Sequence, residues 1–313
     1  MQFNKPSTTV PDQLNLLISR GMSVADRARA ERYLETVGYY RLGAYWLPFE
    51  QPPTPPAVRS KQFQPGTDFD AVVSLYVFDR HLRLLVMEAI ERVEIAIRSR
   101  WTNRLSMAHG AHAHLTANQF KKPFDHARMI SQAGGTVQQS NEVFIKHYLD
   151  KYNDPWLPPL WAVTETFTMG QLSKWVAATK ENSVVSGVAS DLGLPTRETL
   201  EGVLHVLCYV RNIAAHHGRL WNRRLVKFLP NIRRYRADLE RATGQPNSVD
   251  NSVFNVLVVL LKLLEHQSTD TSFPGRLLTL LNERSDGDRR AMGFPADWRT
   301  RPIWTNINLG AGT

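Results

Sequence analysis

Apolar side chains recur every three or four residues over a long stretch from Asp68 to Leu105. This is the period of one face of an α-helix, sustained over several turns. The stretch therefore predicts one long helix, or two nearly continuous ones, and commits the central part of the chain to helical structure. The positions that set the pattern are Val72, Leu75, Tyr76, Leu82, Leu85, Val86, Ala89, Ile90, Val93 and Ile97.

The other periodic segments are also helical. Residues 12–37 predict two short helices, with Ser23 as the N-cap of the second. Residues 196–218 predict a helix that begins at the N-cap Thr196 and ends with Gly218 as a left-handed C-cap. The sequence has no internal repeat and no alternating pattern that would require a sheet, so we expect an all-α fold. Further helices are expected within residues 141–152, 161–180 and 253–265.

A proline-rich segment divides the chain. Residues 51–66 contain five prolines and one glycine, which excludes a helix and predicts an exposed loop. Residues 109–141 are rich in glycine, histidine and polar side chains and are expected to be irregular. We expect an N-terminal helical lobe over residues 1–60, a main helical domain over 67–240, and a C-terminal helix with an irregular tail over 241–313.

The charge and the cysteine content of the chain indicate which partners it could bind and which cellular compartment suits it. The chain has 38 Lys and Arg against 29 Asp and Glu, a formal net charge of +9. Such an excess favours a polyanion such as RNA or DNA, because each neutralised phosphate releases a counterion. A basic protein without such a partner is the alternative. Cys208 is the only cysteine, which excludes an intramolecular disulfide and a cysteine-rich zinc site and fits a reducing cytoplasm.

No segment predicts secretion or a membrane span. The N-terminus lacks an apolar core flanked by basic residues, and the longest apolar stretch, Val253 to Leu264, is too short to cross a bilayer. We therefore expect a soluble, cytoplasmic protein.

A motif near the end of the helix predicted over residues 196–218 carries groups suited to RNA cleavage. Arg211, Asn212 and His216 form R-N-I-A-A-H, with four residues between the arginine and the histidine. An imidazole can take a proton from a ribose 2′-hydroxyl or give one to the leaving 5′-oxygen. A guanidinium stabilises the extra negative charge of a five-coordinate phosphorane. Asn212 could orient the histidine or bind a phosphate oxygen.

This chemistry needs no metal, but the motif leaves its geometry open. The expected products are a 2′,3′-cyclic phosphate and a 5′-hydroxyl, and DNA should resist because it lacks the nucleophile. On an ideal helix Arg211 and His216 lie about 140° apart. They would converge best near a frayed helix end, or by meeting the same pair from a second chain. His217 satisfies a five-residue spacing and is the alternative histidine, and cations at a helix C-terminus can also simply complement the dipole.

The sequence resembles the abortive-infection proteins of the AbiD/AbiF type, a bacterial phage-defence family that contains a HEPN domain. The resemblance covers roughly residues 15–230 in the family's order. It implies an up-and-down helical bundle whose Arg-x4-6-His motifs pair across a dimer, as in the nuclease domains of type VI CRISPR effectors. It also implies that Arg211, Asn212 and His216 are the catalytic residues of an endoribonuclease. The matching stretches are SRGMSVADRARAERYLETVGYYRLGAYWLPFE, FDAVVSLYVFDRHLRLLVMEAIERVEIAIRSR, FIKHYLDKYNDPWLPPLWAVTETFTMGQLSKW and YVRNIAAHHGRLWNR.

Polar residues on the long predicted helix are candidates for a supporting role. Glu94 and Arg98 lie one turn apart and can pair. Together with Glu91 they could orient Arg211 or His216, as could the neighbouring His217, or the three could form ordinary surface salt bridges. The carboxylates could also suggest a metal hydrolase, but no third ligand at a convincing spacing supports one.

Three histidines could bind a metal, because His109, His112 and His114 have a spacing compatible with zinc or copper. We expect a flexible, solvated histidine loop instead, and no metal site. No Walker A segment and no GxGxxG occurs, so no nucleotide cofactor is expected.

A basic, aromatic segment follows the motif. Mixed cations and aromatics suit single-stranded RNA through phosphate neutralisation and base stacking, although they could also be a solvated surface with its aromatics in the core. Two other functions stay open: a non-catalytic protein that binds a structured non-coding RNA, a partner suggested by related systems, and a helix-turn-helix DNA-binding regulator. The candidate RNA-binding residues are Arg219, Trp221, Arg223, Arg224 and Lys227.

Overall fold

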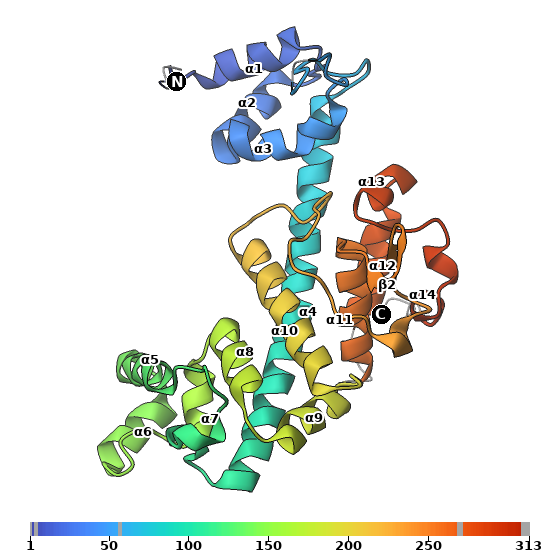
Figure 1. Ribbon diagram of the computed structural model, residues 1–313. Helices are drawn as coiled ribbons and strands as arrows, with labels where there is room; N and C mark the ends of the chain where they lie inside the picture. Colours follow the sequence, from blue (N-terminus) through green and yellow to red (C-terminus); the bar gives the residue numbers. More distant parts are fainter. Residues whose placement is uncertain (1, 3–5, 56–57, 268–271, 308–313) are drawn as a thin grey trace. The chain divides into compact units, whose positions relative to one another are not determined.

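The computed structural model describes residues 2, 6–55, 58–267 and 272–307. Within these ranges the chain is mostly helical, and the only sheet is one short antiparallel β-hairpin. The predicted all-α fold is confirmed. No helix in the described part of the chain has both the length and the apolar character needed to span a membrane. The chain forms two compact units, Met1–Leu82 and Arg83–Thr313, and the helix α4 contributes to both (Figure 1).

The first unit gathers three short helices around the start of α4. The second of these helices is capped by Asp26, whose carboxylate accepts a hydrogen bond from the Arg29 backbone N–H, so the prediction of Ser23 as the cap was wrong. Ser23 instead pairs its backbone with the residues around Asp68 in a short parallel bridge. The three helices are α1 (Val10–Ser19), α2 (Arg27–Thr36) and α3 (Tyr39–Trp46).

The expected loop over residues 51–66 is irregular where it is described, and its residues 56–57 lie outside the described ranges. The segment is closed by an antiparallel bridge between Glu50 and Phe63. The unit does not end at this loop. The buried Asp79 of α4 accepts a hydrogen bond of 2.7 Å from the Tyr45 hydroxyl, so the first turns of α4 belong to the N-terminal core.

The long helix predicted from Asp68 to Leu105 is observed as the single α4, Phe69–His109. Most of its periodic apolar positions are buried, including Val86, Val93 and Ile97, whereas Tyr76 and Leu85 are partly exposed. We expected a lobe boundary near residue 60, whereas the boundary between the compact units falls inside this helix.

Several elements of the second unit contact the part of α4 that follows Leu82, through Thr179, Asp191 and Arg276. Residues 109–141 were expected to be irregular, but they include a regular helix that begins at the N-cap Asp125. The first helices of this unit are α5 (His126–Gln139), α6 (Val143–Lys151), α7 (Leu160–Val163), α8 (Met169–Ala178), α9 (Asn182–Asp191) and α10 (Arg197–Ala215).

The C-terminal segment is also more ordered than predicted. The expectation of an irregular tail after residue 265 was wrong for the described residues, and residues 308–313 lie outside them. The segment belongs to the second unit, because Trp221 donates a hydrogen bond to the Asp288 carbonyl at 3.1 Å. Its elements are β1 (Arg241–Ala242), β2 (Gln245–Val249), α11 (Val253–Glu265), α12 (Phe273–Asn282), α13 (Asp286–Ala291) and α14 (Pro302–Thr305).

Candidate active site

The motif lies at the C-terminal end of α10, beside α4 (Figure 1). The helix begins as predicted, with the Thr196 hydroxyl accepting a hydrogen bond from the Thr199 backbone N–H at 3.2 Å. It ends at Ala215, so Arg211 occupies the last turns and His216 is the C-cap with φ −87° and ψ 16°. The regular helix therefore stops between the two ends of the motif.

The end of α10 differs from the prediction in one respect. His217, with φ +58°, adopts the left-handed conformation that we assigned to Gly218. The Gly218 N–H then bonds to the Ile213 carbonyl at 2.7 Å and the His217 N–H to the Ala214 carbonyl at 3.0 Å, the pattern of a Schellman motif. Glycine is needed at 218 for another reason, since an added Cβ would lie 3.0 Å from the Ile213 side chain and 3.1 Å from its carbonyl.

Arg211 faces a cleft against α4. The cleft has a volume of about 430 Å³ and is lined by Arg211, by Glu91 and Glu94, and by Leu84, Met87, Glu88 and Ile90 of α4. Asn212 and His216 are exposed and are not among the described residues that line it. One chain therefore brings Arg211 together with the two glutamates but does not place His216 in the same cleft.

Glu94 is held in place by Arg98, as the sequence predicted. The Arg98 guanidinium pairs with the Glu94 carboxylate at 2.6 Å. The same guanidinium also reaches Glu165 at 3.3 Å and the Phe167 carbonyl at 3.0 Å, which ties α4 to the segment before α8. Glu94 is thus fixed by a residue that is itself anchored at two further points.

The environment of Glu94 links it electrostatically to the motif. Burial raises the pKa of the Glu94 carboxyl, and the positive charges of Arg98 and Arg211 oppose that rise. Burial likewise raises the pKa of the Cys208 thiol, on the face of α10 that carries the Arg211 charge. The cysteine gave no sequence signal for this location. The thiol donates a long hydrogen bond of 3.5 Å to the Met169 carbonyl.

The basic segment after the motif is more structured than a free cationic loop. Arg223 donates a hydrogen bond of 3.0 Å to the Arg219 carbonyl, and Arg224 forms an ion pair with Asp250. Arg224 nevertheless keeps 70% of its side chain exposed, and Lys227 is half-buried.

Trp221 was expected to contact RNA, but it is only 2% exposed. A base cannot stack on a ring that is covered on both faces, so this expectation is corrected: Trp221 is a core residue. The exposed aromatic ring of the segment is Phe228, which is 69% exposed.

The three histidines at the end of α4 do not form a flexible, solvated loop, and the first of them, His109, is the last residue of the helix. His114 is 1% exposed, and burial, helped by His112 and His126, lowers its pKa to about 3. His109 contacts the Glu181 carboxylate at 2.5 Å. Across the described residues no group of three or more histidine, cysteine or acidic side chains is arranged to hold a metal ion.

Comparison with known proteins gives a family. A family model described as "Abi-like protein" matches residues 32–222, more than half of the chain of 313 residues. The matched region contains all of α4 and α10 and the whole of the motif. No match was found among curated proteins or among solved structures. The chain therefore belongs to the family of Abi-like proteins, whose setting is abortive infection, a defence against phage.

Proposed function

We propose that this protein is a metal-independent endoribonuclease of the HEPN type that acts in abortive infection. The observation that carries the proposal is the placement of the motif at the end of α10. Arg211 lies in the last turns and faces a cleft, and His216 lies just past the helix with an exposed side chain. Both groups are accessible to a phosphodiester, which a motif buried within a helical core would not allow.

The residues divide the chemistry of phosphodiester cleavage between them. His216 takes the proton of a ribose 2′-hydroxyl, whose oxygen attacks the adjacent phosphorus while the bond to the 5′-oxygen breaks. The leaving 5′-oxygen takes a proton from the imidazolium or from water and becomes the 5′-hydroxyl. Arg211 stabilises the charge that builds on the phosphorane, and Asn212 binds a phosphate oxygen or orients the histidine. The products are a 2′,3′-cyclic phosphate and a 5′-hydroxyl.

The active site is composite in this proposal and forms in a two-fold dimer. Since Arg211 faces a cleft that His216 does not line, one motif does not surround a phosphate by itself. A symmetric dimer that brings two copies of α10 together would supply an arginine from one chain and a histidine from the other. Light scattering should then give twice the mass of the chain. A monomer that cleaves RNA would contradict the composite site.

Glu94 acts as a positioning residue for Arg211. Its carboxylate is fixed by Arg98 and carries a charge that attracts the Arg211 guanidinium. The attraction limits the orientations that Arg211 can adopt before a phosphate binds. Glu91, on the exposed side of the same cleft, contributes to the same field.

The deciding experiment is incubation of the purified protein with labelled RNA and with DNA of the same sequence in EDTA, followed by analysis of the product ends. The proposal expects cleavage of RNA alone, with cyclic phosphate ends. Tight RNA binding without cleavage would select a non-catalytic RNA-binding protein, and binding of duplex DNA alone would select a regulator. Cleavage that stops in EDTA would overturn the metal-independent mechanism.

A further inference from the structure

A second cleft on α4 is lined by hydrogen-bond donors and by no acid. It has a volume of about 420 Å³, and its polar lining consists of Arg92, Ser99 and Arg100 from α4 and Gln267 after α11. None of the described residues that line it is acidic, and the others are Ile95, Ala96 and Leu264. The nearest compensation is Glu88, one turn before Arg92, which pairs with it at 3.4 Å. A cleft of this composition favours an anion.

Two donors in this cleft lack an acceptor. Within the described part of the chain, neither Arg100 Nη1 nor Gln267 Nε2 has a hydrogen-bond partner, although both atoms are buried from solvent. Buried donors are normally paired, and the penalty for leaving one unmade is larger for a charged group. Two such atoms on opposite walls of one cleft indicate that an oxygen-rich anion completes their hydrogen bonding.

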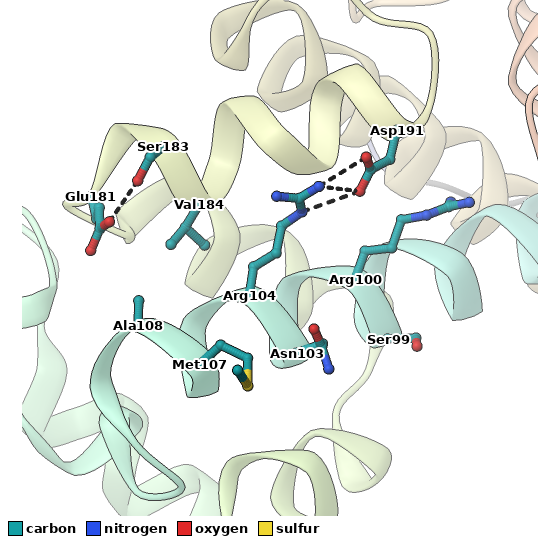
Figure 2. A pocket seen from close by; sticks show the side chains of 10 residues that line it. All are labelled: Ser99, Arg100, Asn103, Arg104, Met107, Ala108, Glu181, Ser183, Val184 and Asp191. Atoms are coloured by element: carbon teal, nitrogen blue, oxygen red, sulfur yellow. Dashed lines mark hydrogen bonds and ion pairs between the residues drawn. The ribbon is translucent and has the colours of Figure 1, made fainter.

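The cleft continues into a larger one. Ser99 and Arg100 also line an adjoining cleft of about 730 Å³ between α4 and α9. Figure 2 shows Arg104 and Asp191 facing each other across it, with Asn103 and Met107 on the same helix as Arg104. The two clefts therefore follow α4 from Arg92 to Met107, a distance of about 22 Å at the rise of an α-helix.

Arg104 is prepared for an additional ligand. Asp191 accepts hydrogen bonds from its Nε at 3.1 Å and from its Nη2 at 2.8 Å, which leaves Nη1 outside the ion pair. The guanidinium lies against Gly187 of α9, where an added Cβ would come within 2.4 Å of Nη1. The ion pair and the glycine fix the orientation of the cation while its side chain stays 40% exposed.

Apolar surface accompanies the cations. Ile95 is 54% exposed and Met107 is 81% exposed, one along each cleft. The acids of the larger cleft already have partners, since Asp191 holds Arg104 and Glu181 contacts Ser183 and His109. The combination of fixed cations with exposed apolar side chains along an extended groove matches a single strand of nucleic acid, whose phosphates and sugars alternate.

We propose that these two clefts form one groove, which binds the sugar–phosphate backbone of an RNA strand with Arg100 as its anchoring cation. The groove is separate from the cleft of Arg211 and from the basic segment after the motif. The inference rests on the proposed function in taking RNA as the ligand, but the binding that it describes requires no cleavage.

The test measures binding of a fluorescein-labelled 12-nucleotide oligouridylate by anisotropy, in an Arg211→Ala background so that the RNA is not consumed. Arg100→Ala should weaken binding about tenfold, the effect of losing one charge-assisted contact, and should reduce the salt slope by roughly one unit. Since Arg100 Nη1 has no hydrogen-bond partner among the described residues, its removal breaks no hydrogen bond of that atom and should leave the fold intact. Arg128→Ala, at an exposed position on α5, makes the same change in net charge and should leave both quantities unchanged.

If Arg100→Ala and Arg128→Ala change RNA binding equally, or if neither changes it, the proposal of the groove is wrong. Inorganic phosphate and AMP serve as competitors that separate the sources of phosphate. The RNA assignment predicts that neither displaces the oligonucleotide at concentrations where unlabelled oligouridylate does. Displacement by either competitor that depends on Arg100 would overturn the assignment in favour of a small phosphate compound. If binding depends on Arg100 and the wild-type protein, with Arg211 intact, cleaves no RNA in EDTA, the ribonuclease proposal is wrong and the groove proposal stands.

Discussion

Two clefts along α4 differ in the charge of the residues that surround their arginine. Arg211 faces α4 where Glu91 and Glu94 supply negative charge, whereas the smaller of the two clefts lined by Arg100 has no acid among its described lining residues. The acids of the larger cleft, Glu181 and Asp191, already have partners. In the first cleft the negative charge of Glu94 attracts the Arg211 guanidinium before any ligand binds. In the second the balancing charge must come from outside. This difference fits the two proposals: catalysis in the first cleft, where the orientation of the cation matters most, and RNA binding in the second.

The largest effect should come from the motif itself. His216→Ala removes the proton-transfer group and should lower the rate of RNA cleavage by ~10²–10⁴-fold, and Arg211→Ala should do at least the same. Arg211→Lys should also fail, because an ammonium keeps the charge but loses the planar two-point contact. Single-turnover cleavage at saturating RNA is the measurement, with Arg128→Ala as the control that retains activity.

A different outcome for the two histidine variants would change which histidine is assigned as catalytic. If His216→Ala cleaves at the wild-type rate while a variant of His217 is inactive, the catalytic histidine is the neighbouring residue. If His216→Ala and His217→Ala both cleave RNA at the wild-type rate, the proposed ribonuclease mechanism is wrong, and the contrast between the two clefts no longer concerns catalysis.

A smaller effect should follow from Glu94→Gln. The amide oxygen can still accept from Arg98, but the charge that orients Arg211 is gone, so we expect a loss of about tenfold in rate, the equivalent of 1.4 kcal/mol. RNA affinity should change little, because the charge removed is negative and lies in the chemical cleft. A wild-type rate in this variant would show that Arg211 is oriented without Glu94.

The variant His217→Gly tests whether the left-handed backbone at the end of α10 lowers the stability of the protein. A left-handed residue with a Cβ is strained, and glycine relieves that strain, so the free energy of unfolding should rise by about 1 kcal/mol. Denaturant melts of the variant and of His217→Ala, which keeps the Cβ, make a matched pair. A loss of stability in the glycine variant would mean that the interactions of the imidazole outweigh the strain.

The smallest effect should come from Arg224→Ala. Arg224 already pairs with Asp250, so its charge is partly compensated, unlike that of Arg100. We expect RNA binding to weaken by about twofold, the scale of an exposed ion pair. If Arg224→Ala lowers the RNA affinity as much as Arg100→Ala does, the basic segment is a main RNA contact. Pairing with an acid would then not distinguish the weak RNA contacts from the strong ones.

Periodicity predicted the long helices well, because α4 and α10 bury a continuous apolar face that local sequence reveals. It failed for α5, which contains Gly134 and Gly135 in its interior. Gly134 is explained only by tertiary structure, since an added Cβ there would lie 2.7 Å from the Trp156 ring. Glycine marked a close contact rather than a break in the helix.

The candidate site shows the same limit. The Glu94–Arg98 pair follows from a spacing of four residues and was predicted correctly. The burial of Trp221 and the unpaired nitrogen of Arg100 depend on residues far away in the sequence, such as Asp288 and Gln267. From composition alone, Trp221 was predicted to contact RNA. Nothing in the sequence distinguished Arg100 from the other arginines of α4.

The contact between Arg104 and Gly187 also constrains how this protein can evolve. Any side chain introduced at 187 must push the Arg104 guanidinium aside and thereby disturb its ion pair to Asp191, so this exchange changes the orientation of the cation while Arg104 is present. Once Arg104 has been replaced by a smaller residue, a side chain at position 187 no longer meets the guanidinium. The two positions are therefore coupled, and relatives of this chain that keep arginine at 104 should carry glycine at 187 more often than relatives that have lost it.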